Sequence, residues 1–536
     1  MIVSIFNDVI GPVMRGPSSS HCAAALRIGR LARDLVGGTP EEVLVEFDRA
    51  GSLPTTHDTQ GSDMGLCGGL LGWDAADPRL PGSAESLATE GASLRFETVD
   101  VGDPHPNTYR LHLGRAGQTH SLRAISTGGG MIEVIDIDGW GLSLHGDCHE
   151  TLLVVTGDAA RPRAEGIKVH LESVAAVDHA EILENASGCL VRARSQAMLG
   201  DAAVAALGPG IRRVHRLAPV LPVRTPRDVR VPFASCAELL AEDAGRGVPL
   251  WQHAVAYEMQ RGGLGDREVT AMMVDIVRIL RRSIAEGIAG TSYDDRVLPA
   301  QAPGFARAMA AGRLVGDAVL NKIVLATTAL MEVKSSMGVI VAAPTAGACA
   351  ALPAAVITLA EEMHLDEEAM ARALLAAGLV GVFIATPWSF AAEVGGCQAE
   401  GGSAAAMAAA AIVTLAEGSL TQSLAAASMA FQSMIGLICD PVGNRVEVPC
   451  LGKNVMAAAN ALCCANMALA GFDAVIPFDE VVATASRVAG QMPRELRCTA
   501  LGGLSITPTS LALEERLAQR RLERCGTGGC GCHGST

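Results

Sequence analysis

The chain has 536 residues, a formal net charge of −15, few aromatic residues (3%) and 15 cysteines. A chain of this length folds into several domains with substantial cores, and its acidic balance argues against nucleic acid or an anionic membrane surface as a partner. The first ten residues are too polar for a signal peptide, so we expect a cytoplasmic protein whose cysteines bind metal or act as thiols rather than form disulfides.

Residues 1–150 combine β-rich runs with helical stretches and glycine-rich turns. The expected strands are EVLVEF (42–47), RLHL (110–113) and MIEVIDI (131–137). We therefore predict an N-terminal α/β domain over residues 1–150.

The segment GPSSSHCAAALRIGR (16–30) places Ser18, Ser19, Ser20 and His21 directly before an apolar helical pattern. One serine is enough to cap a helix. A helix N-terminus also offers free N–H groups and positive potential, so additional polar side chains there suit a carboxylate or phosphate. Local chemistry leaves both interpretations, capping and anion binding, open.

Residues 151–222 begin with TLLVVTGD and end near IRRVHRLAPV, with a polar helical segment between them. This pattern predicts a small regulatory unit of βαβ type. Pro219, Pro222 and Pro226 then mark a linker.

Residues 223–524 consist of long apolar or amphipathic stretches rich in Ala, Leu and Met and broken at glycine-rich loops, which predicts an all-α domain. The longest uncharged stretches, 373–392 and 418–439, contain proline or several polar residues, so we expect buried helices rather than membrane spans. The Gly- and Cys-rich end of the chain, 525–536, is expected to form a flexible tail.

Three cysteines of the helical domain lie in loops beside glycine or proline: Cys397 in GGCQAEGG, Cys439 in ICDPVGN and Cys450 in VEVPC. Such turns can direct thiolates inward while backbone N–H groups bond the sulfur, as iron–sulfur clusters require. Without a CxxC pair the pattern alone indicates a metal only weakly, and the lack of histidines at the usual spacing disfavours zinc.

Nine short motifs, spread over nearly the whole chain, carry a resemblance to a known family. The first four are SIFNDVIGPVMRGPSSSH, GSDMGLCGGLLGW, DPRLPGSAES and ISTGGGMIEV. The others are APTAGACAALPA, GCQAEGG, CDPVGNRVEVPC, KNVMAAANA and RCTALGGLSITPT. In order, they resemble the β part and the α part of the iron–sulfur-dependent L-serine dehydratases. The spacing from Cys397 to Cys439 (42 positions) and from Cys439 to Cys450 (11 positions) is that of the family's cluster ligands.

The resemblance implies a fusion of a β-type domain (1–150), an ACT-like regulatory unit (151–222) and an all-α catalytic domain (223–524). It implies a homodimer that converts a small amino acid, L-serine, to pyruvate and ammonia, with a [4Fe–4S] cluster on the three cysteines. An open iron is a Lewis acid for the hydroxyl leaving group, and a base removes the α-proton. The residues expected at the substrate are Ser18, Ser19, Ser20, His21, Asp63, Thr345 and Gly347, with His21, His57 and Ser19 as catalytic candidates.

Departures from the family pattern leave the base and the substrate open. Gln60 stands where the family has a histidine, and His57 lies three positions upstream. The loop AGTSYDDRVLPAQ replaces a glycine-rich element and is either a solvated loop or part of a pocket for an additional charged group. For Lys334 and Lys453, structural and pocket roles are equally open.

Three functions follow from these features. The first is an iron–sulfur dehydratase of L-serine. The second is a lyase of the same fold that acts on another β-substituted amino acid, such as cysteine or a charged β-hydroxy amino acid. The third is a non-catalytic amino-acid sensor, which the change at Gln60 favours and the three retained cysteines disfavour.

Overall fold

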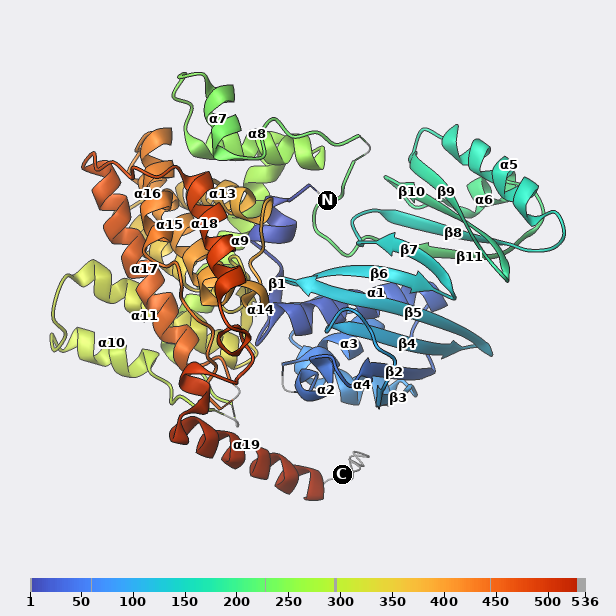
Figure 1. Cartoon of the computed structure of the whole chain (residues 1–536), viewed down its shortest axis with the longest axis horizontal. Coiled ribbons are helices and arrows are strands. Elements are labelled where there is room, and N and C mark those ends of the chain that lie inside the picture. Colours follow the sequence, from blue (N-terminus) through green and yellow to red (C-terminus); the bar gives the residue numbers. More distant parts are fainter. Residues whose placement is uncertain (1, 59, 227, 294–295, 444, 528–536) are drawn as a thin grey trace. The chain divides into compact units, whose positions relative to one another are not determined.

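The computed structural model describes residues 2–58, 60–226, 228–293, 296–443 and 445–527, and the chain divides into two compact units (Figure 1). Unit 1 contains residues 1–232 and 256–269, and unit 2 contains residues 233–255 and 270–536. Unit 1 is mixed α/β and unit 2 is mainly helical, as the sequence predicts. Of the expected tail, residues 528–536 lie outside the described residues.

A six-stranded sheet forms the centre of unit 1. In spatial order its strands are β3 (Ser93–Val99), β2 (Glu42–Asp48), β4 (Thr108–Arg115), β5 (Gln118–Gly128), β6 (Met131–Ile137) and β7 (Trp140–Leu144). Only β2 and β3 pair in parallel among these neighbours. Side chains alternate along the strands, so that Val43, Val45 and Phe47 of β2 are buried in the core. The three predicted strand runs lie within β2, β4 and β6.

Two helices pack closely within this core, α1 (Ala24–Val36) and α3 (Ser62–Leu70). Their contact depends on glycine, because a Cβ atom on Gly65 would lie 2.1 Å from the Cys22 carbonyl oxygen. A Cβ atom on Gly69 would lie 2.1 Å from the Leu26 carbonyl oxygen. The GSDMGLCGGL motif therefore brings the start of α3 against the start of α1. The other short helices here are α2 (Leu53–Thr56), η3 (Leu80–Gly82) and α4 (Ser83–Thr89).

A second, four-stranded antiparallel sheet follows in unit 1. Its elements in chain order are β8 (His149–Val155), α5 (Ala160–Glu172), β9 (Val177–Asn185), β10 (Gly188–Ser195), α6 (Asp201–Ala206) and β11 (Ile211–Leu217). The spatial order β11-β8-β10-β9 is that of a ferredoxin-like βαββαβ unit. One face of the sheet packs on α5, while Leu152, Val154 and Leu217 join the core of the six-stranded sheet.

The N-terminal segment binds a part of the chain that is distant in sequence. The Ser4 hydroxyl and the Ile5 N–H donate to the two carboxylate oxygens of Glu258, at 2.5 and 2.8 Å. Glu258 lies in the second half of α8 (Leu250–Gly262). Asn7, in the turn η1 (Ile5–Val9), exchanges two hydrogen bonds with the backbone of Val223, at 2.7 and 2.9 Å. Unit 1 is thus completed by residues that follow the first part of unit 2 in the chain.

Unit 2 is a helical bundle around α15 (Ser403–Leu415), whose alanines 404–406 and 408–411 are fully buried. Such small side chains allow close packing against α12, α13, α16 and α17. The helices of this part are α7 (Cys236–Asp243), α10 (Ala302–Ala310), α11 (Ala318–Ser335), α12 (Ala351–Glu362), α13 (Glu367–Ala385), α14 (Ala392–Gly395), α16 (Leu420–Gln432), α17 (Val448–Leu469), α18 (Phe478–Gln491) and α19 (Pro508–Thr527). The remaining elements are β1 (Val13–Arg15), η2 (Ser19–Ala23), α9 (Asp266–Ala289), β12 (Val339–Val341), η4 (Gln398–Gly402), η5 (Arg494–Leu496) and η6 (Gly503–Ile506).

One described helix, α13, is long and apolar enough to cross a membrane. In the fold, 78% of its apolar window is buried inside the protein. It covers most of the uncharged stretch 373–392, for which the sequence predicts a buried helix.

Candidate functional site

The serine-rich segment of unit 1 forms a single wide helical turn, η2, ahead of α1. Ser18 precedes this turn, and its side chain makes no capping hydrogen bond. Its hydroxyl lies instead 3.0 Å from Nδ1 of His21 and 3.2 Å from the Ser20 hydroxyl. Ser19 and His21 are buried. The geometry therefore directs Ser18 to the histidine rather than to the helix end.

His21 is held on both sides of its ring. Nε2 lies 3.1 Å from the Thr56 hydroxyl, which itself donates to the Ser52 carbonyl at 2.8 Å. Nε2–H is therefore the donor to Thr56, and Nδ1 is left to accept from a serine hydroxyl. Burial lowers the pKa of His21 to about 4, so the ring is neutral at pH 7.

His57 and Asp63 form a second polar pair close to this segment. His57 follows Thr56 at the end of α2, and its Nδ1 lies 2.7 Å from Oδ1 of Asp63, in the first turn of α3. The imidazole also packs on Phe47 and Phe96, at ring distances of 5.1 and 5.0 Å. A carboxylate that accepts from Nδ1–H leaves Nε2 as the unprotonated, basic nitrogen. Burial raises the pKa of Asp63.

These contacts bring six of the predicted residues together at the start of α1 and α3: Ser18, Ser19, Ser20, His21, His57 and Asp63. Thr56 is the link, since it bonds His21 and precedes His57 in the chain. The sequence resemblance names the six residues but does not show that Asp63 is bonded to His57.

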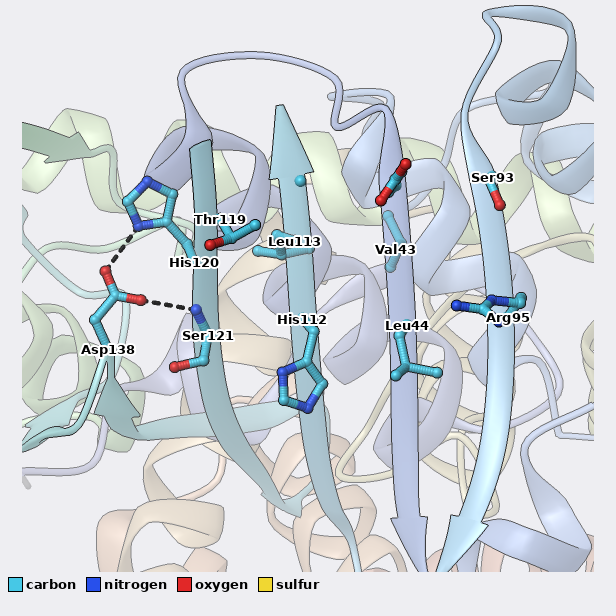
Figure 2. Close-up of a pocket in the computed structure, with 12 residues that line it drawn as sticks. Val43, Leu44, Ser93, Arg95, His112, Leu113, Thr119, His120, Ser121 and Asp138 are labelled. Carbon is cyan, nitrogen blue, oxygen red and sulfur yellow. Dashed lines mark hydrogen bonds and ion pairs between the residues drawn. The ribbon is translucent and has the colours of Figure 1, made fainter. Parts of the chain in front are cut away.

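A cavity of about 680 Å³ lies elsewhere in unit 1, over strands β2 to β5 (Figure 2). His112, Leu44 and Arg95 line it, and at its edge Asp138 accepts from Nδ1 of His120 and from the Ser121 N–H, both at 2.7 Å. None of the residues predicted from the sequence lines this cavity.

The three predicted cluster ligands come together in unit 2. Cys397 lies between α14 and η4, Cys439 follows α16, and Cys450 lies in the first turn of α17; all three are buried. The Cys439 and Cys450 thiols hydrogen-bond to the Cys397 sulfur, which holds the pKa of Cys397 well below its ordinary value. The loops that separate these cysteines in the sequence thus bring the Cys439 and Cys450 thiols within hydrogen-bonding distance of the Cys397 sulfur.

Lys453, one turn after Cys450, lies against this set of thiols. Its Nζ donates to Oδ1 of Asp440 at 2.6 Å and to the Ile438 carbonyl at 2.8 Å, and it lies 3.6 Å from the Cys397 sulfur. Asp440 also accepts from the Leu504 N–H at 3.1 Å. A partly buried ammonium group next to sulfur stabilises the thiolate form.

Thr345 and Gly347 belong to a loop that is tied to the thiol set by two other residues. The Thr345 hydroxyl donates to Oε1 of Glu400 at 2.7 Å, and the Gly347 carbonyl accepts from the Asn454 amide at 2.8 Å. The same amide nitrogen donates to the Cys450 carbonyl at 2.8 Å. Burial raises the pKa of Glu400 to about 8.

A fourth cysteine, Cys498, joins the set although the sequence analysis does not single it out. It packs against Cys397 and Cys439, and its N–H donates to the Cys439 carbonyl at 3.2 Å. Its thiol hydrogen-bonds to that of Cys439. The signal in the sequence is the cysteine of RCTALGGLSITPT, a motif that by itself indicates only the family.

The loop that departs from the family pattern is held in its described part by contacts within the loop and by Glu447 of unit 2. Arg296 donates to the Thr291 carbonyl and hydroxyl at 2.7 and 2.8 Å, and its guanidinium group lies over the Tyr293 ring. Glu447 accepts from the N–H groups of Val297 and Leu298 at 3.1 and 3.0 Å. Asp294 and Asp295 lie outside the described residues.

The donor chemistry of unit 2 fits an iron–sulfur cluster, because cysteine thiolates are the ligands of such clusters and three buried cysteines meet here. Within the described ranges, no group of three or more His, Cys, Asp or Glu side chains is arranged to hold a metal ion. The thiols are in mutual hydrogen bonds, with Cys397 as the shared acceptor.

Comparison with known proteins places these features in a family. Residues 245–505 match the family described as serine dehydratase alpha chain. A probable L-serine dehydratase alpha chain of Bacillus subtilis is 34% identical over 285 residues, which are 53% of this chain and 95% of the relative. The probable beta chain of the same organism is 41% identical over 155 residues, 29% of this chain and 69% of the relative.

A single-chain relative matches almost the full length. The L-serine dehydratase of Streptomyces coelicolor is 28% identical over 526 residues, which cover 94% of this chain and 99% of the relative. Both separate chains and a fused chain are therefore among the similar proteins. This chain belongs to the L-serine dehydratase family, as a fused form with similarity to both the alpha and the beta chains.

Proposed function

We propose that this protein deaminates L-serine to pyruvate and ammonia with a [4Fe–4S] cluster held by Cys397, Cys439 and Cys450. The observation that carries the proposal is the meeting of these three buried thiols in a chain of this family. When bound, a cluster with three thiolate ligands supplies an open iron that acts as a Lewis acid toward the β-hydroxyl group.

Polar residues of unit 2 position the cysteine sulfurs and the loop that contains Thr345 and Gly347. Lys453 favours the thiolate form of Cys397 and is itself held by Asp440. Asn454 fixes the Gly347 carbonyl relative to the Cys450 backbone. Because this holds the loop next to the cluster ligands, we assign Thr345 and Gly347 to substrate binding.

The base that removes the α-proton is assigned to His57. Its Nδ1–H is committed to Asp63, so Nε2 carries the lone pair that a base needs. His21 is neutral, with Nε2–H bonded to Thr56, so we assign it with Ser18, Ser19 and Ser20 to binding of the substrate carboxylate. In these assignments Gln60 takes no part in proton transfer.

The four-stranded part of unit 1 is proposed to be an ACT-like regulatory unit. Its ferredoxin-like strand order and its helix-covered face support this assignment. We further propose a cytoplasmic homodimer with a small amino acid as its partner and with neither nucleic acid nor membrane, in keeping with the net charge of −15. Light scattering at several protein concentrations tests the dimer.

The function is tested with protein that is purified and reconstituted without oxygen. The cluster is followed by visible absorption and iron content, and pyruvate release is measured with L-serine and L-cysteine. Pyruvate from L-serine by the cluster-loaded protein is the expected result. If L-cysteine is converted and L-serine is not, the protein is a lyase of the second type. If L-serine binds but no product forms, the protein is a sensor.

A further inference from the structure

Lys334 is a buried basic residue whose ammonium group has no hydrogen-bond partner among the described residues. It lies in the last turn of α11, and its side chain is fully buried. Its Nζ has no hydrogen-bond partner in the described part of the chain. A buried ammonium group is strongly unfavourable unless an anion or hydrogen-bond acceptors compensate for its lost hydration.

The groups near Lys334 do not supply that compensation. Its charge acts on three described groups, Cys349, Glu400 and Cys450. Burial raises the pKa of Cys349 to about 12 and that of Glu400 to about 8, despite the opposing effect of Lys334. Both groups are therefore mainly neutral at pH 7. Of the three neighbours, Cys450 is the one that we assign as a cluster ligand.

Lys453 makes a useful contrast on the other side of the same thiol set. Its Nζ is paired with the Asp440 carboxylate at 2.6 Å and with a backbone carbonyl at 2.8 Å. Its charge is therefore balanced within the protein, whereas Lys334 has no such partner in the described ranges.

Lysine is rare in this chain, yet two of its lysines lie next to the cysteines of unit 2. The sequence has four lysines, Lys168, Lys322, Lys334 and Lys453, among 42 basic residues other than histidine. Lys168 and Lys322 are at the surface, each beside a glutamate. The other two lie at the cysteine set, on α11 and α17. Lysine differs from arginine in carrying a compact point charge, which suits a small buried site.

We propose that Lys334 is the counter-charge for the anionic cluster that Cys397, Cys439 and Cys450 hold. This inference rests on the proposed function. Three thiolates outweigh the charge of a [4Fe–4S] core in its resting state, so the loaded site carries a net negative charge that the unpaired ammonium group offsets. In the empty protein the same ammonium group is a destabilising buried charge.

This role predicts effects of opposite sign in the empty and the loaded protein. Lys334→Met keeps an unbranched side chain that is one atom shorter, and it removes the charge. The empty variant should unfold at a higher temperature than the empty wild type, because a buried uncompensated charge is gone. The loaded variant should lose its cluster to an iron chelator about 10- to 100-fold faster, the usual range for loss of a group that supports metal ligands. Its cluster should also have a more negative midpoint potential.

Lys322→Met on the same helix is the matched control, since it removes an exposed charge and should change neither cluster loss nor potential. Unchanged chelator kinetics and potential in Lys334→Met would refute the counter-charge role. A lower unfolding temperature of the empty variant would show a structural role instead. Failure of the wild type to take up any cluster would refute the proposed function itself, which separates the two failures.

Discussion

The polar site of unit 1 and the thiol site of unit 2 differ in how far other residues of the chain supply hydrogen-bond partners and opposite charges for their polar groups. In unit 1, His21 is held between Ser18 and Thr56, and His57 is held by Asp63, so each ring has a defined proton position. In unit 2, the thiols hydrogen-bond to one another, and the part of the chain that the structure describes gives the Lys334 ammonium group no hydrogen-bond partner. The first site is preorganised by protein groups alone, whereas the second is arranged around charge that an added group must balance.

The largest effect is expected from removing a thiol of unit 2. Cys397→Ser should abolish the cluster and all pyruvate formation, because Cys397 is the central thiol of the set, hydrogen-bonded to both Cys439 and Cys450. Anaerobic absorption and iron content measure the result. Cys349→Ser, at a buried cysteine outside the ligand set, should keep the cluster. Wild-type iron content in Cys397→Ser would remove this residue from the ligands.

A smaller but still large effect is expected from the histidine pair of unit 1. Asp63→Asn should lower kcat by about 10²- to 10⁴-fold, because the amide no longer fixes the proton on Nδ1 of His57. Iron content should not change. Asp138→Asn alters a similar histidine–aspartate pair, that of His120, at the cavity of Figure 2, and should leave kcat near wild type. Equal losses in the two variants would contradict the assignment of His57 as the base.

The neutral state of buried His21 predicts a dependence of stability on pH. Its pKa is about 4 in the folded protein and 6.5 when exposed, so the unfolded chain alone binds a proton between these values. Stability from this group is complete above pH 6.5 and is lost as the pH falls toward 4. Between pH 7 and pH 5 the loss is about 2 kcal/mol.

Urea denaturation at both pH values measures this effect, with His21→Gln as the comparison. The variant should lack this part of the pH dependence. The same change in unfolding free energy in both proteins would show that His21 is not the titrating group.

The smallest effect is expected at Ser18. Ser18→Ala removes one hydrogen bond to Nδ1 of His21, worth about 1 kcal/mol, and the Ser20 hydroxyl at 3.3 Å remains as a second donor. A several-fold rise in KM for L-serine with unchanged iron content is the expected kinetic result. A loss of helix content with unchanged KM would favour the capping role that the sequence left open.

Local patterns in the sequence predicted much of this fold. The run MIEVIDI coincides with β6, because its alternation directs Ile132 and Val134 into the core. The glycine motif that starts at Gly61 indicated only the family, and the fold shows what it does: Gly65 and Gly69 allow a close contact that residues with a Cβ atom would prevent. That Cys397, Cys439 and Cys450 meet in the fold could be predicted only from the family resemblance, because their local sequence pattern indicates a metal site only weakly.

What the sequence could not predict depends on contacts between distant segments. Cys498 reaches Cys439 across 59 positions (498 − 439), by a backbone contact that no local pattern encodes. Lys334 and Lys453 were equally suited to structural and pocket roles in the sequence. Only the fold shows that Lys453 is paired with Asp440, while Lys334 has no hydrogen-bond partner among the residues described. The bond from His57 to Asp63 likewise depends on how α2 meets α3.

The return of residues 256–269 to unit 1 bears on how such a protein can be divided between genes. Bacillus subtilis has separate alpha-chain and beta-chain relatives, whereas this chain is continuous. A break after Pro232 would leave the buried Glu258 on one fragment and its donors, Ser4 and Ile5, on the other. Each fragment would then expose an unfinished core until it met its complement. A split form of this chain would thus depend on the meeting of its two fragments, whereas a single chain supplies both in equal amounts.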